Sequence, residues 1–120
     1  MKTVLIVDDV QTDRELMGLV VQAAGYAAVY AKDGAEAIAM AKQHHPGLVL
    51  LDIVMPGMDG FAACRALKKD PDTASIPVVF ATSKGNASDE FWGKKLGAVG
   101  HIAKPFTPEK VLEIMKQHLG

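Results

Sequence analysis

The sequence predicts a doubly wound α/β fold, in which helices cover both faces of a parallel β-sheet. Short apolar runs alternate along the whole chain with longer segments whose apolar residues recur every three or four positions. The short runs are apolar throughout, which is typical of strands buried on both faces of a parallel sheet. Right-handed crossovers between such strands place the connecting helices on the two faces of one sheet.

The first half of the chain is expected to alternate strand, helix, strand, helix and strand. The strands are predicted from their aliphatic and β-branched residues, and the helices from apolar residues at helical spacing, with Gly25 and Pro46 beyond the helix ends. Asp33 is the expected N-cap of the second helix. In chain order these elements are residues 4–7, 12–24, 27–31, 33–44 and 48–51.

The second half continues the alternation from a loop rich in Pro, Gly and Asp at residues 55–60. Pro77 must lie at the start of its strand, where no hydrogen bond of the sheet is lost. Thr107 is the expected N-cap of the last helix, with Pro108 at its first position. In chain order the predicted elements are residues 61–68, 77–81, 88–96, 99–103 and 107 to the C-terminal region.

Length and composition restrict the function further. The 120 residues, 49% hydrophobic and 22% charged, predict a single domain over residues 1–120 with its own core and no output domain. Thirteen basic residues against fourteen acidic ones leave no basic field, so nucleic acid is not an expected partner. No apolar run is long enough for a signal peptide or a membrane span, which favours a cytoplasmic protein. The single cysteine, Cys64, is expected in the core.

Reactive side chains follow four of the five predicted strands, where an open α/β sheet binds its ligands. Carboxylates about 4 Å apart repel by about 4 kcal/mol at an effective dielectric constant of 20, so their convergence requires a cation. Carboxylate oxygens suit Mg²⁺, with Mn²⁺ as the alternative, while a lysine and a hydroxyl can hold an anion. The pattern indicates a site that receives a phosphoryl group on an aspartate. Its candidate residues are Asp8, Asp9, Asp52, Thr82, Ser83 and Lys104.

These motifs resemble those of response-regulator receiver domains, of the stand-alone type typified by the chemotaxis regulator. The resemblance covers the whole chain in order and implies a flavodoxin-like (βα)5 fold with strand order 2-1-3-4-5. It also implies a phosphorylation-activated switch of a two-component phosphorelay. A sensor histidine kinase or phosphotransfer domain would supply the phosphoryl group, and output would be binding to an unknown protein target. The motifs are Asp8-Asp9, Leu51-Asp52 with Met-Pro-Gly-Met-Asp-Gly at 55–60, Ala81-Thr82-Ser83 and Lys104-Pro105-Phe106.

The resemblance also implies a role for each site residue. Asp52 would be the phosphoacceptor, Asp9 a direct ligand of Mg²⁺ and Asp8 a ligand through water. The main-chain carbonyl of Val54 would complete the protein ligands. Two further residues would act on the phosphoryl group. Lys104 would pair with its oxygens, and Thr82 would move to bond one of them.

The sequence departs from the family pattern at several positions. The aromatic residue expected three positions before the conserved lysine is His101, which is predicted to act in the switch with Thr82. The apolar side chain of Val54 predicts slow autodephosphorylation, and Lys84 is a candidate contact of the phosphoryl group. The Trp-Gly-Lys stretch at 92–94 is similar to twitching-motility regulators of type IV pilus systems. Trp92 is either a core residue or an anchor on a partner face that would comprise Trp92, Lys95, His101 and Phe106.

Four other functions are alternatives. The protein could drain phosphoryl groups from a shared kinase instead of delivering a signal. A haloacid-dehalogenase-type phosphatase would need a second aspartate at the position of Val54. A flavodoxin-like electron carrier would need a phosphate-binding loop where the chain has Asp8-Asp9-Val10-Gln11. A constitutive docking module would not need the complete set of site residues.

Overall fold

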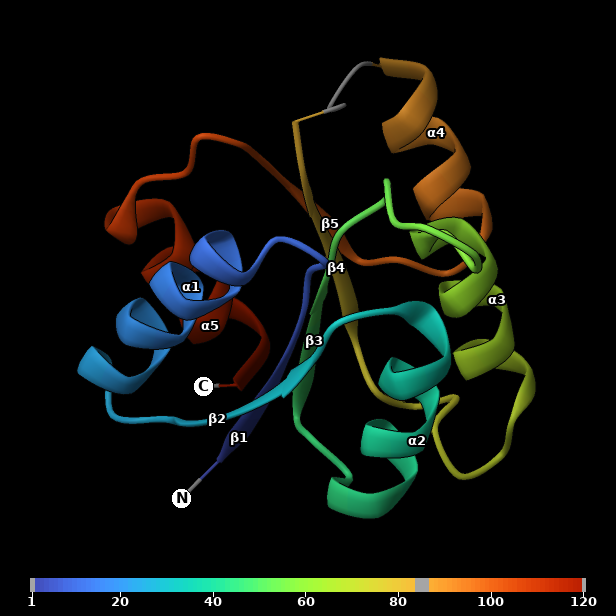
Figure 1. Cartoon of the computed structure of the whole chain (residues 1–120), viewed down its shortest axis with the longest axis horizontal. Helices are drawn as coiled ribbons and strands as arrows, with labels where there is room; N and C mark the ends of the chain where they lie inside the picture. Colours follow the sequence, from blue (N-terminus) through green and yellow to red (C-terminus); the bar gives the residue numbers. More distant parts are fainter. Residues whose placement is uncertain (1, 84–86, 120) are drawn as a thin grey trace.

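A computed structural model describes residues 2–83 and 87–119, in which five strands alternate with five helices along the chain (Figure 1). Within these residues no helix is both long and apolar enough to cross a lipid bilayer. The elements are β1 (Thr3–Val7), α1 (Gln11–Ala23), β2 (Ala27–Ala31), α2 (Gly34–His44), β3 (Leu48–Leu51), α3 (Gly60–Lys69), β4 (Val78–Thr82), α4 (Ala87–Lys95), β5 (Gly100–Ala103) and α5 (Pro108–Leu119).

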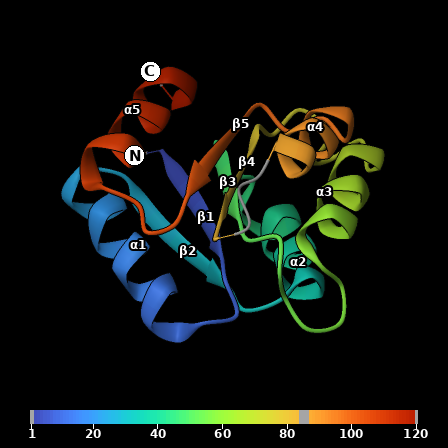
Figure 2. The ribbon, with the colours of Figure 1, turned by 90° about the horizontal axis from the view of Figure 1, so that it is seen from above.

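All neighbouring strands run parallel, in the order β2-β1-β3-β4-β5, which confirms the predicted fold and strand order. Helices α1 and α5 cover one face of the sheet, and α2, α3 and α4 cover the other, as two perpendicular views show (Figures 1 and 2). The chain passes from β1 to β2 on one side of β1 and then to β3 on the other side of β1. Such a reversal opens a crevice at the carboxyl ends of the two strands.

The core consists of two apolar clusters, one on each face of the sheet. Alternate residues of β1 serve the two clusters: Leu5 packs toward α2 and α3, whereas Ile6 packs toward α1 and α5. Phe80 of β4 is fully buried, and its ring meets that of Phe61 edge-on at 5.4 Å between centroids. Because the central strands are buried on both faces, their carboxyl ends are held firmly in place.

Side-chain caps define several helix starts. The Asp33 carboxylate accepts a hydrogen bond from the Glu36 amide at 2.8 Å, and the Thr107 hydroxyl accepts one from the Lys110 amide at 3.2 Å, which confirms both predicted caps. Helix α3 also has a cap, at a residue predicted only as part of a loop. The Asp59 carboxylate accepts a hydrogen bond from the Ala62 amide at 2.9 Å. This cap fixes where the loop after Asp52 turns into α3.

Cys64 lies in the core, as predicted, with no exposed surface. Its thiol donates a weak hydrogen bond to the Leu96 carbonyl at 3.6 Å, and burial raises the pKa of the thiol. Because the thiolate is the reactive form, we expect no reaction with a disulfide reagent at mildly alkaline pH in the native protein and complete reaction in denaturant. A time course of thiol labelling checks this, and rapid labelling of the native protein would contradict it.

Candidate functional site

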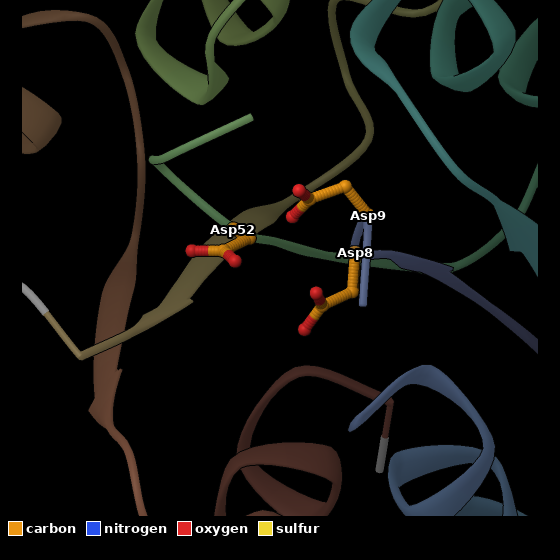
Figure 3. A group of neighbouring side chains, drawn as sticks. All are labelled: Asp8, Asp9 and Asp52. Carbon is orange, nitrogen blue, oxygen red and sulfur yellow. The ribbon is translucent and has the colours of Figure 1, made fainter. Parts of the chain in front are cut away.

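Three carboxylates meet at the carboxyl ends of β1 and β3 (Figure 3). Asp8 and Asp9 follow β1, and Asp52 follows β3, whose end is tied to β1 by the Asp52 amide donating to the Val7 carbonyl at 3.0 Å. One oxygen from each carboxylate lies within 4.8 Å of the other two. Asp8 and Asp52 are buried, whereas Asp9 is exposed. The sheet therefore brings together the three acids that the sequence placed at strand ends.

Lys104, which follows β5 near the C-terminal end of the chain, completes the cluster. Its amide donates to the Thr82 carbonyl at 3.0 Å, and the peptide bond between Lys104 and Pro105 is cis. The ammonium nitrogen, Nζ, donates to Asp8 Oδ2 and lies 3.3 Å from both Asp52 Oδ2 and Asp13 Oδ2. One cation is thus shared by three carboxylates.

The charges around Lys104 keep it protonated. Burial is the largest single influence and lowers the pKa of this ammonium, but the hydrogen bond to Asp8 and the charges of Asp52 and Asp8 together outweigh it, so the pKa is raised. One ammonium still faces Asp8, Asp13 and Asp52, with the Asp9 carboxylate in the same cluster. The remaining negative charge suits a divalent cation, and the donor atoms are the hard oxygens that Mg²⁺ prefers.

A cavity of about 530 Å³ opens beside the acidic cluster. Its polar wall includes Asp9, Asp52 and Lys104, and its apolar wall includes Val54 and Phe106. The side chain of Val54 is half exposed, so it borders the space in front of the Asp52 carboxylate. The cavity is large enough to admit a small ligand or a protein side chain.

Asp13 is a site residue that sequence reasoning missed. It lies in the first turn of α1, one helical turn after Asp9, and both line the cavity. Its spacing from Asp9 was the available signal, because residues four apart lie on the same side of a helix. This signal was not sufficient, because Asp9 precedes the helix. The direction of the Asp13 side chain therefore depended on where α1 begins.

Thr82 is the last residue of β4 and is completely buried. It pairs in register with Ala103 of β5, so it lies next to the strand end that leads into Lys104. Ser83 lines the cavity. The structure therefore places the carboxyl end of β4, with Thr82, beside Lys104. The movement of Thr82 stays a prediction.

The expected partner face is divided between two places. Trp92 is 56% exposed, which excludes the core alternative, and Lys95 lies with its ammonium 5.4 Å from the centre of the neighbouring Phe91 ring. His101 pairs with Phe80 in the sheet and lines a second cavity, of about 190 Å³, whose wall also includes residues of α4. Phe106, by contrast, packs toward α1 and α5 and lines the acidic cavity.

Gly93 has a packing role in α4. Gly93 is buried, and a Cβ built on it would lie 3.0 Å from Cδ2 of Phe80. The missing side chain lets α4 approach β4 closely, which accounts for a glycine inside this helix. Lys84, a candidate phosphoryl contact, lies outside the described residues.

Comparisons with known proteins agree with this geometry. The chain is 40% identical over 120 residues to Protein PilH of Pseudomonas aeruginosa, covering all of this chain and 99% of that protein. It is 36% identical over 115 residues to the phosphate regulon transcriptional regulatory protein PhoB of the same organism, of which it spans half.

The solved structures lead to the same family. The fold superposes on chemotaxis protein CheY4 of Vibrio cholerae with a TM-score of 0.93 at 32% identity over 98% of both chains. A putative response regulator from Chloroflexus aurantiacus also gives a TM-score of 0.93, at 34% identity over 98% of this chain and 97% of that one. The profile of the response regulator receiver domain matches residues 4–116. The chain therefore belongs to the response regulator receiver domain family and is a receiver domain of a two-component response regulator.

Proposed function

We propose that this receiver domain accepts a phosphoryl group on Asp52 from a phosphohistidine of a sensor histidine kinase or phosphotransfer domain. The observation that carries the proposal is the shared ammonium of Lys104, which contacts Asp52 and Asp8 beside a cavity of about 530 Å³. In-line phosphoryl transfer depends on positioning and charge neutralisation, and the buried strand ends supply the first. Lys104 supplies part of the second, because its ammonium can exchange a carboxylate for a phosphoryl oxygen.

Receiver domains bind Mg²⁺ at an acidic pocket, and the acids of this chain fit such an ion. We assign Asp9 and Asp52 as direct ligands, Asp8 as a ligand through water and the main-chain carbonyl of Val54 as the last protein ligand. Mn²⁺ is the alternative ion, since it shares the preference for oxygen donors. The bound ion would neutralise the carboxylates and orient the phosphoryl oxygens.

The signal would leave the site through the last two strands. Phosphorylation adds about 1.5 to 2 negative charges, and a nearly complete switch needs about 5.5 kcal/mol of differential stabilisation. We assign the hydroxyl of Thr82 and the ammonium of Lys104 to the phosphoryl group, and His101 to the relay toward α4. The output surface would be the exposed part of α4 with Trp92 and Lys95, without Phe106, which lines the acidic cavity.

The similarity to Protein PilH and to a chemotaxis protein favours a role in twitching motility or chemotaxis. A phosphate sink for a shared kinase is the alternative within the same chemistry. The two differ in whether the phosphorylated protein binds a target, so retention of a partner by the phosphorylated form alone would favour signal output.

Intact-mass measurement tests the central proposal. The parent protein is treated with acetyl phosphate or phosphoimidazole, with and without Mg²⁺, and compared with Asp52→Asn. A Mg²⁺-dependent gain of one phosphoryl group is expected in the parent and not in Asp52→Asn. Asp72→Asn, which removes an exposed acid outside the cluster, serves as the control and should behave as the parent does. The proposal fails if neither donor modifies the parent.

Val54 is expected to make the phosphorylated state long-lived. Its exposed apolar side chain borders the cavity and offers no hydrogen bond to an attacking water. Val54→Asn should therefore shorten the half-life of the phosphoprotein about tenfold, which corresponds to about 1.4 kcal/mol in the barrier. The decay of the phosphorylated mass measures this. Val54→Ala is the control, because it removes bulk without adding a polar group, and equal decay of the two variants would refute the explanation.

A further inference from the structure

The partly exposed carboxylate of Asp13 lines the same cavity as Asp52. Its Oδ2 lies 3.3 Å from Nζ of Lys104, the same distance that separates this nitrogen from Oδ2 of Asp52. The distance between the Asp13 and Asp52 oxygens is therefore at most twice this value. The Asp13 side chain is 43% exposed, whereas that of Asp52 is 10% exposed, so Asp13 is the more accessible of the two from solvent.

Asp13 differs from the other acids of the site in what balances its charge. Asp8, Asp9 and Asp52 form the cluster that suits a divalent cation, and Asp52 is the assigned phosphoacceptor. Asp13 lies outside that cluster and has its described ionic contact with Lys104. Once Lys104 turns to the incoming phosphoryl group, Asp13 remains as an uncompensated negative charge near the donor.

We propose that Asp13 selects the phosphodonor, favouring phosphoramidates of imidazole over acyl phosphates. The inference rests on the proposed function and adds a substrate preference to it. An acyl phosphate brings a dianionic phosphoryl group and releases a carboxylate, both of which Asp13 repels. A phosphoimidazole brings the same phosphoryl group on a ring that carries a positive charge when protonated, and Asp13 attracts this ring.

The bonds formed and broken show where these charges lie. In both reactions an oxygen of the Asp52 carboxylate forms a bond to phosphorus. With a phosphoimidazole protonated on its second ring nitrogen, the P–N bond breaks, its electron pair stays on nitrogen and neutral imidazole leaves. With acetyl phosphate the P–O bond breaks, its electron pair stays on oxygen and acetate leaves. Because Asp13 lines the same cavity as Asp52, its charge would act with opposite sign on the two leaving groups.

The test compares the two small donors on the same protein. The bimolecular rate constant of phosphorylation is measured by intact mass with Mg²⁺ for the parent, Asp13→Asn and Asp13→Glu. Asp13→Asn is expected to lower the ratio of the phosphoimidazole to the acetyl phosphate rate constant about fivefold, from the Coulomb energy of a half-exposed charge. Asp13→Glu, which keeps the charge, should restore the ratio.

Two further measurements separate charge selection from a structural role. Glu15→Gln is the matched control, because this exposed acid of the same helix accepts from Gln11 at 2.9 Å, away from the cavity lining, and should leave the ratio unchanged. The ratio of the parent should approach that of Asp13→Asn at about 1 M salt, where the Debye length is about 3 Å.

The outcomes are distinct. A parent that is phosphorylated and an Asp13→Asn ratio that equals the parent's would overturn the selection by Asp13 and leave the proposed function intact. A loss of rate that is equal for both donors would also overturn it, because it would mean that Asp13 only positions Lys104. A parent that neither donor modifies would overturn the proposed function and the inference together.

Discussion

Replacing Lys104 by methionine is expected to lower the free energy of unfolding by about 3 kcal/mol in Mg²⁺-free buffer, as when one partner of a buried ion pair is removed. Methionine keeps much of the apolar stem but not the charge. The buried Asp8 then loses the ammonium that now contacts it, and Asp52 and Asp13 lose the same partner. Urea unfolding followed by circular dichroism measures the change.

Added Mg²⁺ should recover part of this loss, because a divalent cation would again neutralise Asp8 and Asp52. The parent should gain less from Mg²⁺ than Lys104→Met does. Lys110→Met is the matched control: Lys110 is exposed and its ion pair with the exposed Glu113 has a distance of 4.0 Å, so the expected cost is below about 0.5 kcal/mol. Equal costs for the two variants would show that Lys104 is not a structural cation of the site.

The pH dependence of this contribution follows from the raised pKa of Lys104. A basic group whose pKa is higher in the folded protein stabilises it most at pH values below its ordinary pKa of 10.5. The contribution is therefore complete at neutral pH and is lost only as the pH rises through the raised pKa. The difference between the parent and Lys104→Met should accordingly stay constant from neutral pH until strongly alkaline solution.

Gly60→Ala is expected to lower the free energy of unfolding by about 3 kcal/mol, at the upper end for overpacking. A Cβ on Gly60 would lie 2.1 Å from the Asp52 carbonyl oxygen and 2.7 Å from Cα of Ile53. Both obstacles are backbone atoms, and the Gly60 amide is tied to the Ile53 carbonyl at 2.8 Å. The loop that carries Asp52 must move, so the rate of phosphorylation should fall as well. Urea unfolding and intact mass measure the two effects.

Gly57→Ala is the control for this prediction. Gly57 lies in the same loop and has a φ of +74°, but a Cβ there would meet no atom within 4 Å. The expected cost is the left-handed backbone penalty of about 1 to 2 kcal/mol, with little change in the rate of phosphorylation. If Gly60→Ala were no more costly than Gly57→Ala, the close approach of α3 to Asp52 would not be the cause.

Local sequence was enough to predict most elements. The apolar strands, the Asp33 and Thr107 caps and the buried Cys64 all agree with the structure, because each depends on residues near in the chain. Periodicity and helical crossovers predicted the class of fold, but the order 2-1-3-4-5 came from resemblance to a family. Residue patterns within a strand do not state which strand lies beside it.

The residue order alone shows which reactive residues stand at the strand ends, and parallel strands in one sheet bring Asp8, Asp9, Asp52 and Lys104 to one edge. The contact of Asp13 with Lys104, in contrast, depends on tertiary packing, since it joins two residues that lie 91 positions apart in the chain. The same holds for Phe106, which lies with the acidic cavity instead of the surface of α4, and for Gly60, whose lack of a side chain is required by the backbone of Asp52. The physical reason is that strand ends are set by the local chain, whereas side-chain direction and close approach depend on atoms of distant segments.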